Sequence, residues 1–229
     1  MSETDPKIYI VIPAYNEGKV IEQTILSLKN ERYSNILVVN DGSSDKTKEN
    51  AHLAGAEVID HIINRGQGAA LRTGIEYLRE NSDPDIIVTF DADGQHQAKD
   101  IQKFVELISK GECDIALGSR FLAKKSNIPR LRKIILKLGV IFTRFISDIA
   151  VTDTHNGFRA LGRKAIQSIE ITQRGMEHAS EIIDEIKKRK LSFKEVPVEV
   201  IYTEYSKIKG QKNSNFVKIG IKMILKKLL

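Results

Sequence analysis

Short runs of β-branched and other apolar residues alternate with amphipathic stretches from residue 8 to about residue 120. The apolar runs predict strands, and the stretches between them, with apolar residues every three or four positions, predict helices. Strands are expected at 8–12, 36–39, 57–60, 86–90 and 114–117, and helices at 19–28, 46–53, 69–78 and 100–108. This alternation indicates βαβ units, and therefore an α/β fold with a mostly parallel central sheet and helices on both faces.

The pattern becomes less regular after residue 120. A helix is expected at 179–188 and a strand around Pro197, over 194–202. Residues 130–149 and 216–229 each predict a basic amphipathic helix, which could lie on an anionic membrane surface or pack its apolar face onto the protein. We expect one catalytic domain over residues 1–205, followed by a basic loop and the second amphipathic helix over 206–229.

Composition narrows the class of protein. The chain has 229 residues, of which 41% are hydrophobic and 29% charged, so intrinsic disorder and fibrous structure are excluded. No apolar run reaches the ~18 residues of a membrane span, and the single cysteine, Cys113, fits a reducing compartment. We therefore expect a cytoplasmic protein, peripheral on the cytosolic membrane face if it meets lipid. The net charge of +6 favours anionic partners, but with no Trp and 6% aromatics we expect no nucleic acid among them.

Two acids follow the predicted strand 86–90. Parallel sheets bind ligands at the carboxyl ends of their strands, where Asp91 and Asp93 would repel each other unless a cation or hydrogen-bond donors compensate. Mg²⁺ or Mn²⁺ would do so, taking its other oxygens from substrate phosphates and water, and Gln95 could add a neutral oxygen. The alternative is an Asp-rich turn that caps the following helix.

Other strand ends carry further polar candidates. Asp41 could accept a hydrogen bond from a nucleobase N–H or a ribose hydroxyl, whereas Asp45 is expected to cap its own helix. Glu17 could be a first-turn acid favoured by the helix dipole. Arg65 and Arg120 could lie against a diphosphate or be ordinary surface cations.

Several enzyme classes are disfavoured because their motifs are missing. The first strand is not followed by a glycine fingerprint, residues 157–164 only approach a P-loop, and there is no G-x-S-x-G elbow. The five histidines show no metalloprotease spacing. We interpret most of them as ordinary surface or loop residues, with His96 the one near the proposed metal.

Six motifs together resemble glycosyltransferase family 2, and most closely its branch of dolichyl-phosphate mannosyltransferase and related polyprenyl-phosphate glycosyltransferases. They lie at residues 10–17, 38–45, 64–70, 91–96, 118–120 and 157–159, and the likeness covers about residues 8–205. The resemblance implies a GT-A fold and an inverting transfer of a sugar from a nucleotide-diphosphate donor, a GDP- or UDP-sugar.

The resemblance also implies a set of site residues. The nucleoside would be held by Pro13, Tyr15, Glu17, Val39 and Asp41, and the donor and metal by Asp91, Ala92, Asp93 and Gln95. Arg120 matches a residue near the donor diphosphate, and Asp153 with Arg159 matches the acceptor-side loop.

The sequence departs from the family pattern at two places. Asn40 stands where many members have an acid, so recognition of the base would rest on Asp41. The late Arg-x-x-Gly-x-Ser segment is replaced by residues 205–211, where Lys209 could supply the missing cation without a bidentate fork.

Three functions remain open at this stage. In the first, the acceptor is a polyprenyl phosphate or lipid-linked group, which is already anionic and needs no strong base. In the second, a family 2 transferase acts on a glycan hydroxyl in polysaccharide synthesis, and Asp153 takes the proton. The third is a nucleotide-sugar-binding module without turnover, which the intact acids Asp91, Asp93 and Asp153 argue against.

Overall fold

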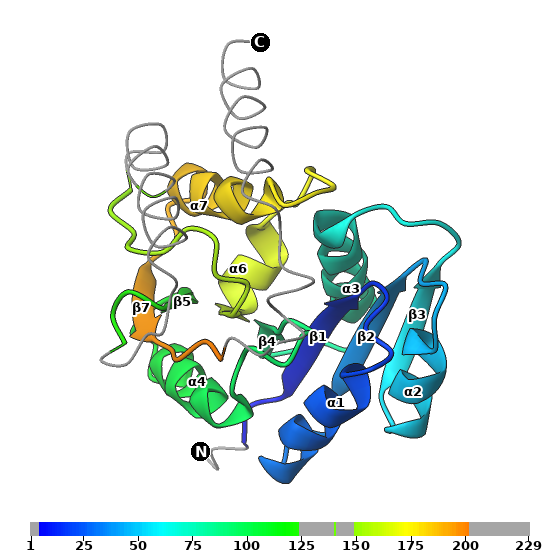
Figure 1. Ribbon diagram of the computed structural model, residues 1–229. Helices are drawn as coiled ribbons and strands as arrows, with labels where there is room; N and C mark the ends of the chain where they lie inside the picture. The colour runs from blue at the N-terminus through cyan, green and yellow to red at the C-terminus, as the bar shows by residue number, and fades with distance from the viewer. Residues whose placement is uncertain (1–4, 124–139, 141–148, 202–229) are drawn as a thin grey trace.

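The computed structural model describes residues 5–123, 140 and 149–201. In this part of the chain one seven-stranded sheet has the strand order β3-β2-β1-β4-β6-β5-β7 (Figure 1). The strands are β1 (Ile8–Ala14), β2 (Ile36–Asp41), β3 (Glu57–His61), β4 (Ile86–Thr89), β5 (Ile115–Ser119), β6 (Arg159–Gly162) and β7 (Phe193–Pro197). All neighbouring pairs are parallel except those that β6 makes with β4 and β5. The expected mixed α/β fold with a mostly parallel sheet is confirmed.

Helices cover both faces of this sheet, as the sequence predicts (Figure 1). The helices are α1 (Ile21–Asn30), α2 (Thr47–Leu53), α3 (Gln67–Asn81), the 3₁₀ turn η1 (Ala98–Asp100), α4 (Ile101–Ser109), α6 (Arg163–Ser168) and α7 (His178–Lys188). The first five expected strands and four expected helices all form, with ends that shift by a few residues. The strand expected over 194–202 is shorter, because β7 ends at Pro197, which cannot donate a ladder hydrogen bond.

One strand and one helix after residue 120 were not predicted from the sequence. The near-P-loop segment 157–164 contains β6 and the start of α6, so it is an antiparallel insertion between β4 and β5. β6 has only four residues and begins with an arginine, so it lacks the run of β-branched residues that reveals the other strands. Its partners lie some seventy and forty residues away, which no local pattern indicates.

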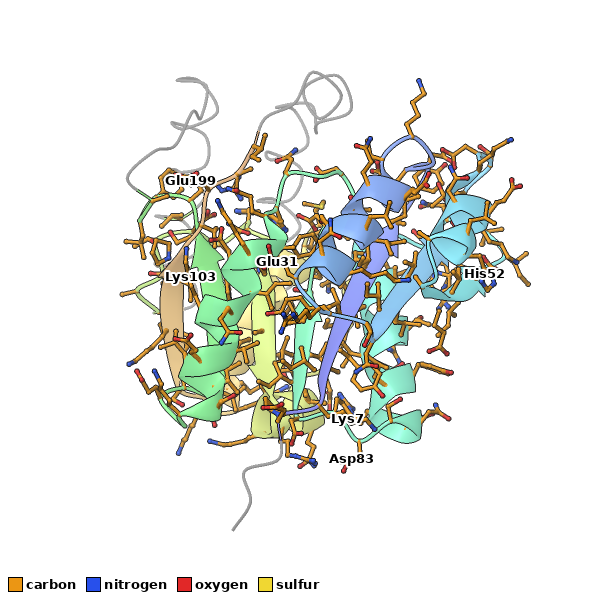
Figure 2. All side chains as sticks on the ribbon, turned by 90° about the horizontal axis from the view of Figure 1, so that it is seen from below. Lys7, Glu31, His52, Asp83, Lys103 and Glu199 are labelled. Carbon is orange, nitrogen blue, oxygen red and sulfur yellow. The ribbon has the colours of Figure 1, made fainter. Side chains whose placement is uncertain are left out.

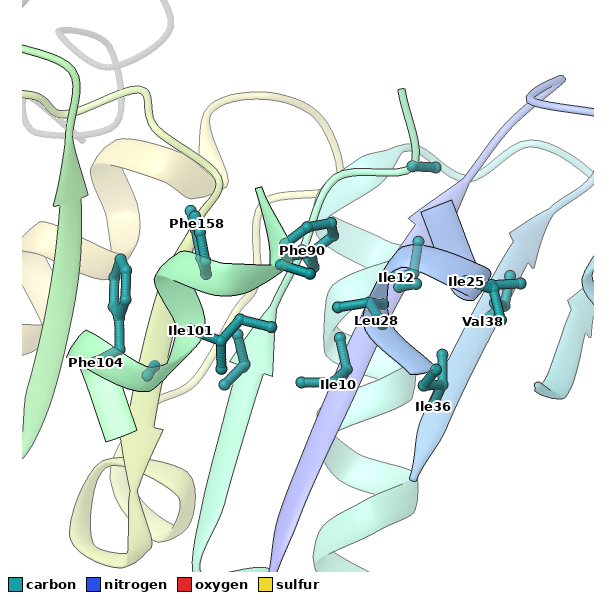
Figure 3. Close-up of a cluster of buried hydrophobic side chains, with 14 of the residues drawn as sticks. Ile10, Ile12, Ile25, Leu28, Ile36, Val38, Phe90, Ile101, Phe104 and Phe158 are labelled. Atoms are coloured by element: carbon teal, nitrogen blue, oxygen red, sulfur yellow. The ribbon is translucent and has the colours of Figure 1, made fainter. Parts of the chain in front are cut away.

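Alternate residues of each central strand enter two separate cores. On β1, Ile10 and Ile12 face α1 and pack with Ile25 and Leu28 (Figure 3). Val11 faces the other side, where it packs against α3. A row of aromatic rings continues the first core toward α4. Phe90, Phe158 and Phe104 stack or meet edge to face with centroids 4.4–5.2 Å apart. Burial of both faces fixes the strand register, so it also fixes which side chains meet at the carboxyl ends.

Most strands of the sheet terminate at the same end. Lys7 lies at the start of β1 and Glu199 lies beyond β7 at the opposite end, the end at which most strands terminate (Figure 2). No helix among the described residues is long and apolar enough to cross a membrane. The predicted amphipathic helices at 130–149 and 216–229, and the domain boundary at 205, fall almost entirely outside the described residues.

Candidate active site

A cavity of about 530 Å³ opens at the carboxyl ends of β1, β2 and β4. Its walls are loops that follow strands, the first turn of α3 and the start of α7. Nine of the predicted site residues line it: Pro13, Tyr15, Glu17, Asp41, Asp91, Ala92, Asp93, Gln95 and Arg120. The sheet therefore brings together residues that are more than one hundred positions apart in the sequence.

The Asp91 carboxylate is fixed from three sides. Gln67 donates its side-chain N–H to Oδ1 at 3.1 Å, and the ring of His96 lies 3.5 Å from Oδ2. The backbone of Gly157 covers the third side so closely that a Cβ added there would lie 2.5 Å from Oδ1. Burial raises the pKa of Asp91, against the opposing charges of Arg120 and Arg159.

Asp93 lies beside Asp91, and its Oδ1 accepts a hydrogen bond from the backbone N–H of Gln95. Burial, together with repulsion from Asp91, raises the pKa of Asp93 to about 6. Two desolvated acids with raised pKa values are the arrangement that a bound cation would relieve.

The residues present fit Mg²⁺ or Mn²⁺. Among the described residues no group of three or more His, Cys, Asp or Glu side chains gathers at one point. Asp91 and Asp93 would therefore supply two oxygens, and the rest would come from ligand phosphates and water, which is the usual mode for Mg²⁺. The Gln95 side chain is buried against the same cavity and is a further oxygen donor there.

Asp41 is held by the loop that leads into α3. Its carboxylate accepts hydrogen bonds from the backbone N–H groups of Arg65 and Gly66, at 2.9 and 2.7 Å, and contacts the ring of His61 at 2.7 Å. Three of its four lone-pair sites are thus used, so one oxygen still has capacity for a ligand in the cavity. Asn40 turns away and donates to Asp60 at 2.9 Å.

The loop after β1 is tied to the loop after β2. Asp45 accepts hydrogen bonds from the backbone N–H of Thr47, the first residue of α2, and from that of Gly18. The N-cap position of α2 is Lys46, so Asp45 lies one residue before the predicted cap position, although its carboxylate accepts from the first residue of the helix. The same carboxylate also holds the loop that carries Tyr15 and Glu17 to the cavity.

Arg120 and Asp153 form a buried ion pair. The Arg120 Nε lies 2.6 Å from Asp153 Oδ2, and a second guanidinium nitrogen donates to the carbonyl of His155 at 3.0 Å. Arg120 lines the cavity, whereas Asp153 lies behind it with 3% of its surface exposed. Asp153 therefore orients Arg120, and this placement does not favour the expected role of Asp153 as a base that contacts the acceptor.

Three other predicted residues do not line the cavity. Val39 is buried in the sheet, and Arg65 meets the site only through its backbone N–H. Arg159 is buried and donates to the carbonyls of Thr154 and Ala179, so it joins the acceptor-side loop to α7. Burial lowers the pKa of Arg159 to about 10, which still leaves the guanidinium charged at neutral pH. Lys209 lies outside the described residues.

The interpretation of most histidines as ordinary surface or loop residues is wrong. His61, His96 and His178 are buried, and three histidines, His96, His155 and His178, line the cavity. Burial lowers the pKa of each of these three to about 4. They are neutral near pH 7 and present lone pairs or N–H groups without charge.

Several residues that line the cavity are not among those predicted from the sequence. Gln67 lies in the motif at residues 64–70 and could have been found there, because an amide after a strand is a candidate ligand. Gly175, Met176 and His178 come from the turn before α7, where no apolar run precedes them. No local pattern indicates that this turn packs against the start of α3.

Comparison with known proteins supports the family resemblance. The model of Glycosyl transferase family 2 matches residues 9–170. An uncharacterized protein of Methanocaldococcus jannaschii, MJ1222, is 42% identical over 97% of this chain and 93% of its own length. A UDP-N-acetylglucosamine–dolichyl-phosphate N-acetylglucosaminyltransferase of Methanococcus voltae is 36% identical over 98% of this chain and 96% of its own length.

A solved structure has the same fold. Glucosyl-3-phosphoglycerate synthase of Mycobacterium tuberculosis superposes with a TM-score of 0.73, at 19% identity, over 96% of this chain and 78% of that one. The sheet and its helices are thus those of a GT-A glycosyltransferase. With the matching family model and the similarity to the two full-length relatives, this chain is a member of glycosyltransferase family 2.

Proposed function

We propose that this enzyme transfers one sugar from a nucleotide-diphosphate donor to a polyprenyl phosphate or lipid-linked phosphate, with a divalent metal ion and inversion at the anomeric carbon. The observation that carries the proposal is the half-buried pair of acids Asp91 and Asp93, which lines a cavity of about 530 Å³. Asp41 and the loop after β1 would hold the nucleoside at one end of this cavity.

The chemistry is a single displacement. An acceptor phosphate oxygen attacks the anomeric carbon from the face opposite the leaving group, and the C–O bond to the nucleoside diphosphate breaks, its electron pair staying on the leaving diphosphate. Asp91 and Asp93 would hold the divalent ion, whose charge would stabilise the leaving diphosphate. Arg120, held by Asp153, adds a fixed cation on the same wall of the cavity.

A phosphate acceptor suits the observed arrangement better than a hydroxyl. A phosphate monoester is already anionic at neutral pH and needs no base, whereas a hydroxyl must lose a proton. Asp153, the expected base, is occupied by Arg120 and does not line the cavity. The Methanococcus voltae relative is named for a dolichyl-phosphate acceptor, which supports the same class of acceptor.

We propose a cytoplasmic location with peripheral attachment to the membrane. The basic residues expected along 130–149, namely Arg130, Lys133, Lys137 and Arg144, would contribute about 1 kcal/mol each at an anionic surface. Co-sedimentation of the full chain with anionic vesicles at low salt would support this, and failure to bind them would count against a lipid acceptor.

A donor panel tests the function. The full chain is incubated with UDP- and GDP-sugars, Mg²⁺ or Mn²⁺, and either polyprenyl phosphate, polyprenol or no acceptor, and released nucleoside diphosphate is measured. We expect release that needs both the metal and polyprenyl phosphate, and a product of inverted anomeric configuration by NMR. Release with polyprenol equal to that with polyprenyl phosphate would overturn the assignment of the acceptor.

A variant separates the two acceptor classes further. Asp153→Asn should cost 10²–10⁴-fold if the carboxylate is a base for a hydroxyl, and less for a phosphate acceptor. Equal losses with polyprenyl phosphate and polyprenol would reject the base role.

A further inference from the structure

His178 is a buried titratable residue for which the proposed reaction has no use so far. It is the first residue of α7, its surface is 3% exposed, and it lines the cavity. Its position is fixed by the first turn of α3, where a Cβ added to Gly68 would lie 2.9 Å from His178 Cβ. The imidazole thus lies between the starts of α3 and α7, on the wall that also carries Gly175 and Met176.

The hydrogen bonds of the ring determine its tautomer. Nδ1 lies 2.8 Å from the carbonyl oxygen of Gly175, and a carbonyl can only accept, so Nδ1 carries the proton. Burial and the charge of Arg159 lower the pKa of His178 to about 4, so the ring is neutral near pH 7 and Nε2 holds a free lone pair. Arg159, Glu181 and His155 are the charged or titratable groups nearby.

No described residue donates to this Nε2, and it is not sealed off from the cavity. An acceptor on a side chain that is 3% exposed and lines the cavity can be satisfied by a hydrogen-bond donor of the ligand. Because the ring is neutral, the matching group is an uncharged O–H or N–H and not a phosphate oxygen, which would require a protonated imidazole.

We propose that His178 is a specificity-determining residue whose Nε2 accepts a hydrogen bond from a hydroxyl, or the amide N–H, of the sugar that is transferred. This rests on the proposed function, since it needs a nucleotide sugar in the cavity. The loops after β1 and β2, which would hold the nucleoside, line this cavity, and His178 lies between the starts of α3 and α7. The sugar is the part of the donor that offers uncharged hydroxyls there.

Binding measurements on the full chain test this assignment. In the presence of Mn²⁺, isothermal titration calorimetry compares the binding of UDP with that of UDP-N-acetylglucosamine, and the binding of GDP with that of GDP-mannose. The nucleotide pair that binds to the wild-type chain is then used for the variants. His178→Phe keeps a ring but removes the acceptor. His178→Gln places an amide oxygen near the position of Nε2. His52→Gln, on the exposed face of α2, is the matched control.

We expect His178→Phe to weaken binding of the nucleotide sugar by roughly 5- to 20-fold, which corresponds to the loss of one hydrogen bond in a site without water. Binding of the nucleoside diphosphate should not change. His178→Gln should recover most of the loss, and His52→Gln should bind both ligands as the wild type does. A thermal melt checks that each variant is folded.

The contrary results are distinct. Equal weakening of the nucleoside diphosphate and the nucleotide sugar, or unchanged binding of both, would overturn the role of His178. A folded His178→Gln variant that binds the nucleotide sugar as weakly as His178→Phe does would also overturn it. Failure of the wild-type chain to bind either pair would instead contradict the proposed function itself.

Discussion

At the scale of single residues, the acid pair shows how site chemistry and stability oppose each other. The side chains of Asp91 and Asp93 are desolvated beside each other, and their raised pKa values mean that ionisation is unfavourable without a cation. The pKa of Asp93 is about 6 in the folded protein and about 3.9 in the unfolded chain. Because the folded state resists ionisation of Asp93, the folded state loses stability as the pH rises from about 3.9 through about 6.

Asp93→Asn should therefore stabilise the metal-free protein at pH 7.5 while it removes metal-dependent binding of nucleoside diphosphate. Each pKa unit corresponds to about 1.4 kcal/mol, and after allowance for partial exposure we expect a gain of roughly 1–2 kcal/mol. Urea unfolding with EDTA at pH 7.5 and pH 4 measures this, and the gain should shrink at pH 4. Asp184→Asn, at an exposed position on α7, is the control. A destabilised Asp93→Asn at pH 7.5 would contradict the argument.

Gly157 is required by the close approach of the Asp91 carboxylate. A Cβ there would lie 2.5 and 2.7 Å from the two carboxylate oxygens, so Gly157→Ala should displace Asp91. We expect about 10²-fold lower transferase activity, the usual result when a reacting group is misplaced by about 1 Å. Gly111→Asn is the control, because this glycine has a positive φ that Asn tolerates and a Cβ there meets open space. Wild-type activity in Gly157→Ala would show that Asp91 can move freely.

At the scale of elements, the turn before α7 is held by one carboxylate. Glu181 accepts hydrogen bonds from the backbone N–H groups of Thr172 and Gln173, at 3.0 and 2.8 Å, and also pairs with the Thr172 hydroxyl. The carbonyl of Arg174 in turn accepts from the N–H of Ala69 in α3. This turn brings Gly175, Met176 and His178 to the cavity, so the order of the site depends on it.

Glu181→Ala should loosen the turn. Hydrogen bonds to a charged group contribute about 1.5–3 kcal/mol each, so the turn should open more often and expose the bond after Arg174 to trypsin. We expect cleavage at this position to become faster than in the wild type, as measured by mass spectrometry of limited digests. Glu170→Ala removes an exposed ion pair with Arg189 and should leave the rate unchanged. Unchanged cleavage in Glu181→Ala would show that α3 alone holds the turn.

At the scale of the whole molecule, the neutral histidines of the cavity make the fold sensitive to acid. The pKa of these histidines is lowered to about 4 in the folded protein, whereas it is near 6.5 in the unfolded chain. Below pH 6.5 the unfolded chain therefore binds protons that the folded state does not bind, and the folded state loses stability as the pH falls toward 4. Protonation of His96, His155 and His178 in the unfolded chain should each lower the stability by about 2 kcal/mol at pH 5, and protonation of Asp93 offsets part of this loss.

We therefore expect the free energy of unfolding of the metal-free protein to fall by roughly 4 kcal/mol between pH 7.5 and pH 5. Urea denaturation at the two pH values measures the difference. His178→Phe, which cannot be protonated, should lose less stability over the same interval. An equal fall in the variant and the wild type would mean that His178 does not contribute.

Much of the fold could be predicted because its signals are local. Each of the first five strands is an apolar run, and the polar residues that follow β1, β2 and β4 line the cavity because parallel strands end on the same side. Asp91 and Asp93 were found in this way. The role expected for Asp153 does not agree with its placement, because the ion pair with Arg120 depends on a loop thirty-three residues away.

The βαβ order, the family and the acids at the carboxyl end of β4 could be read from the amino-acid sequence, because they depend on periodicity and on residues adjacent in the chain. The antiparallel entry of β6, the pairing of Asp153 with Arg120 and the position of His178 at the cavity became visible in the folded structure. These features depend on contacts between segments that are far apart in the sequence and that exclude water when they pack together. The neutral state of the His178 imidazole and the pairing of Arg120 with Asp153 both depend on this loss of water.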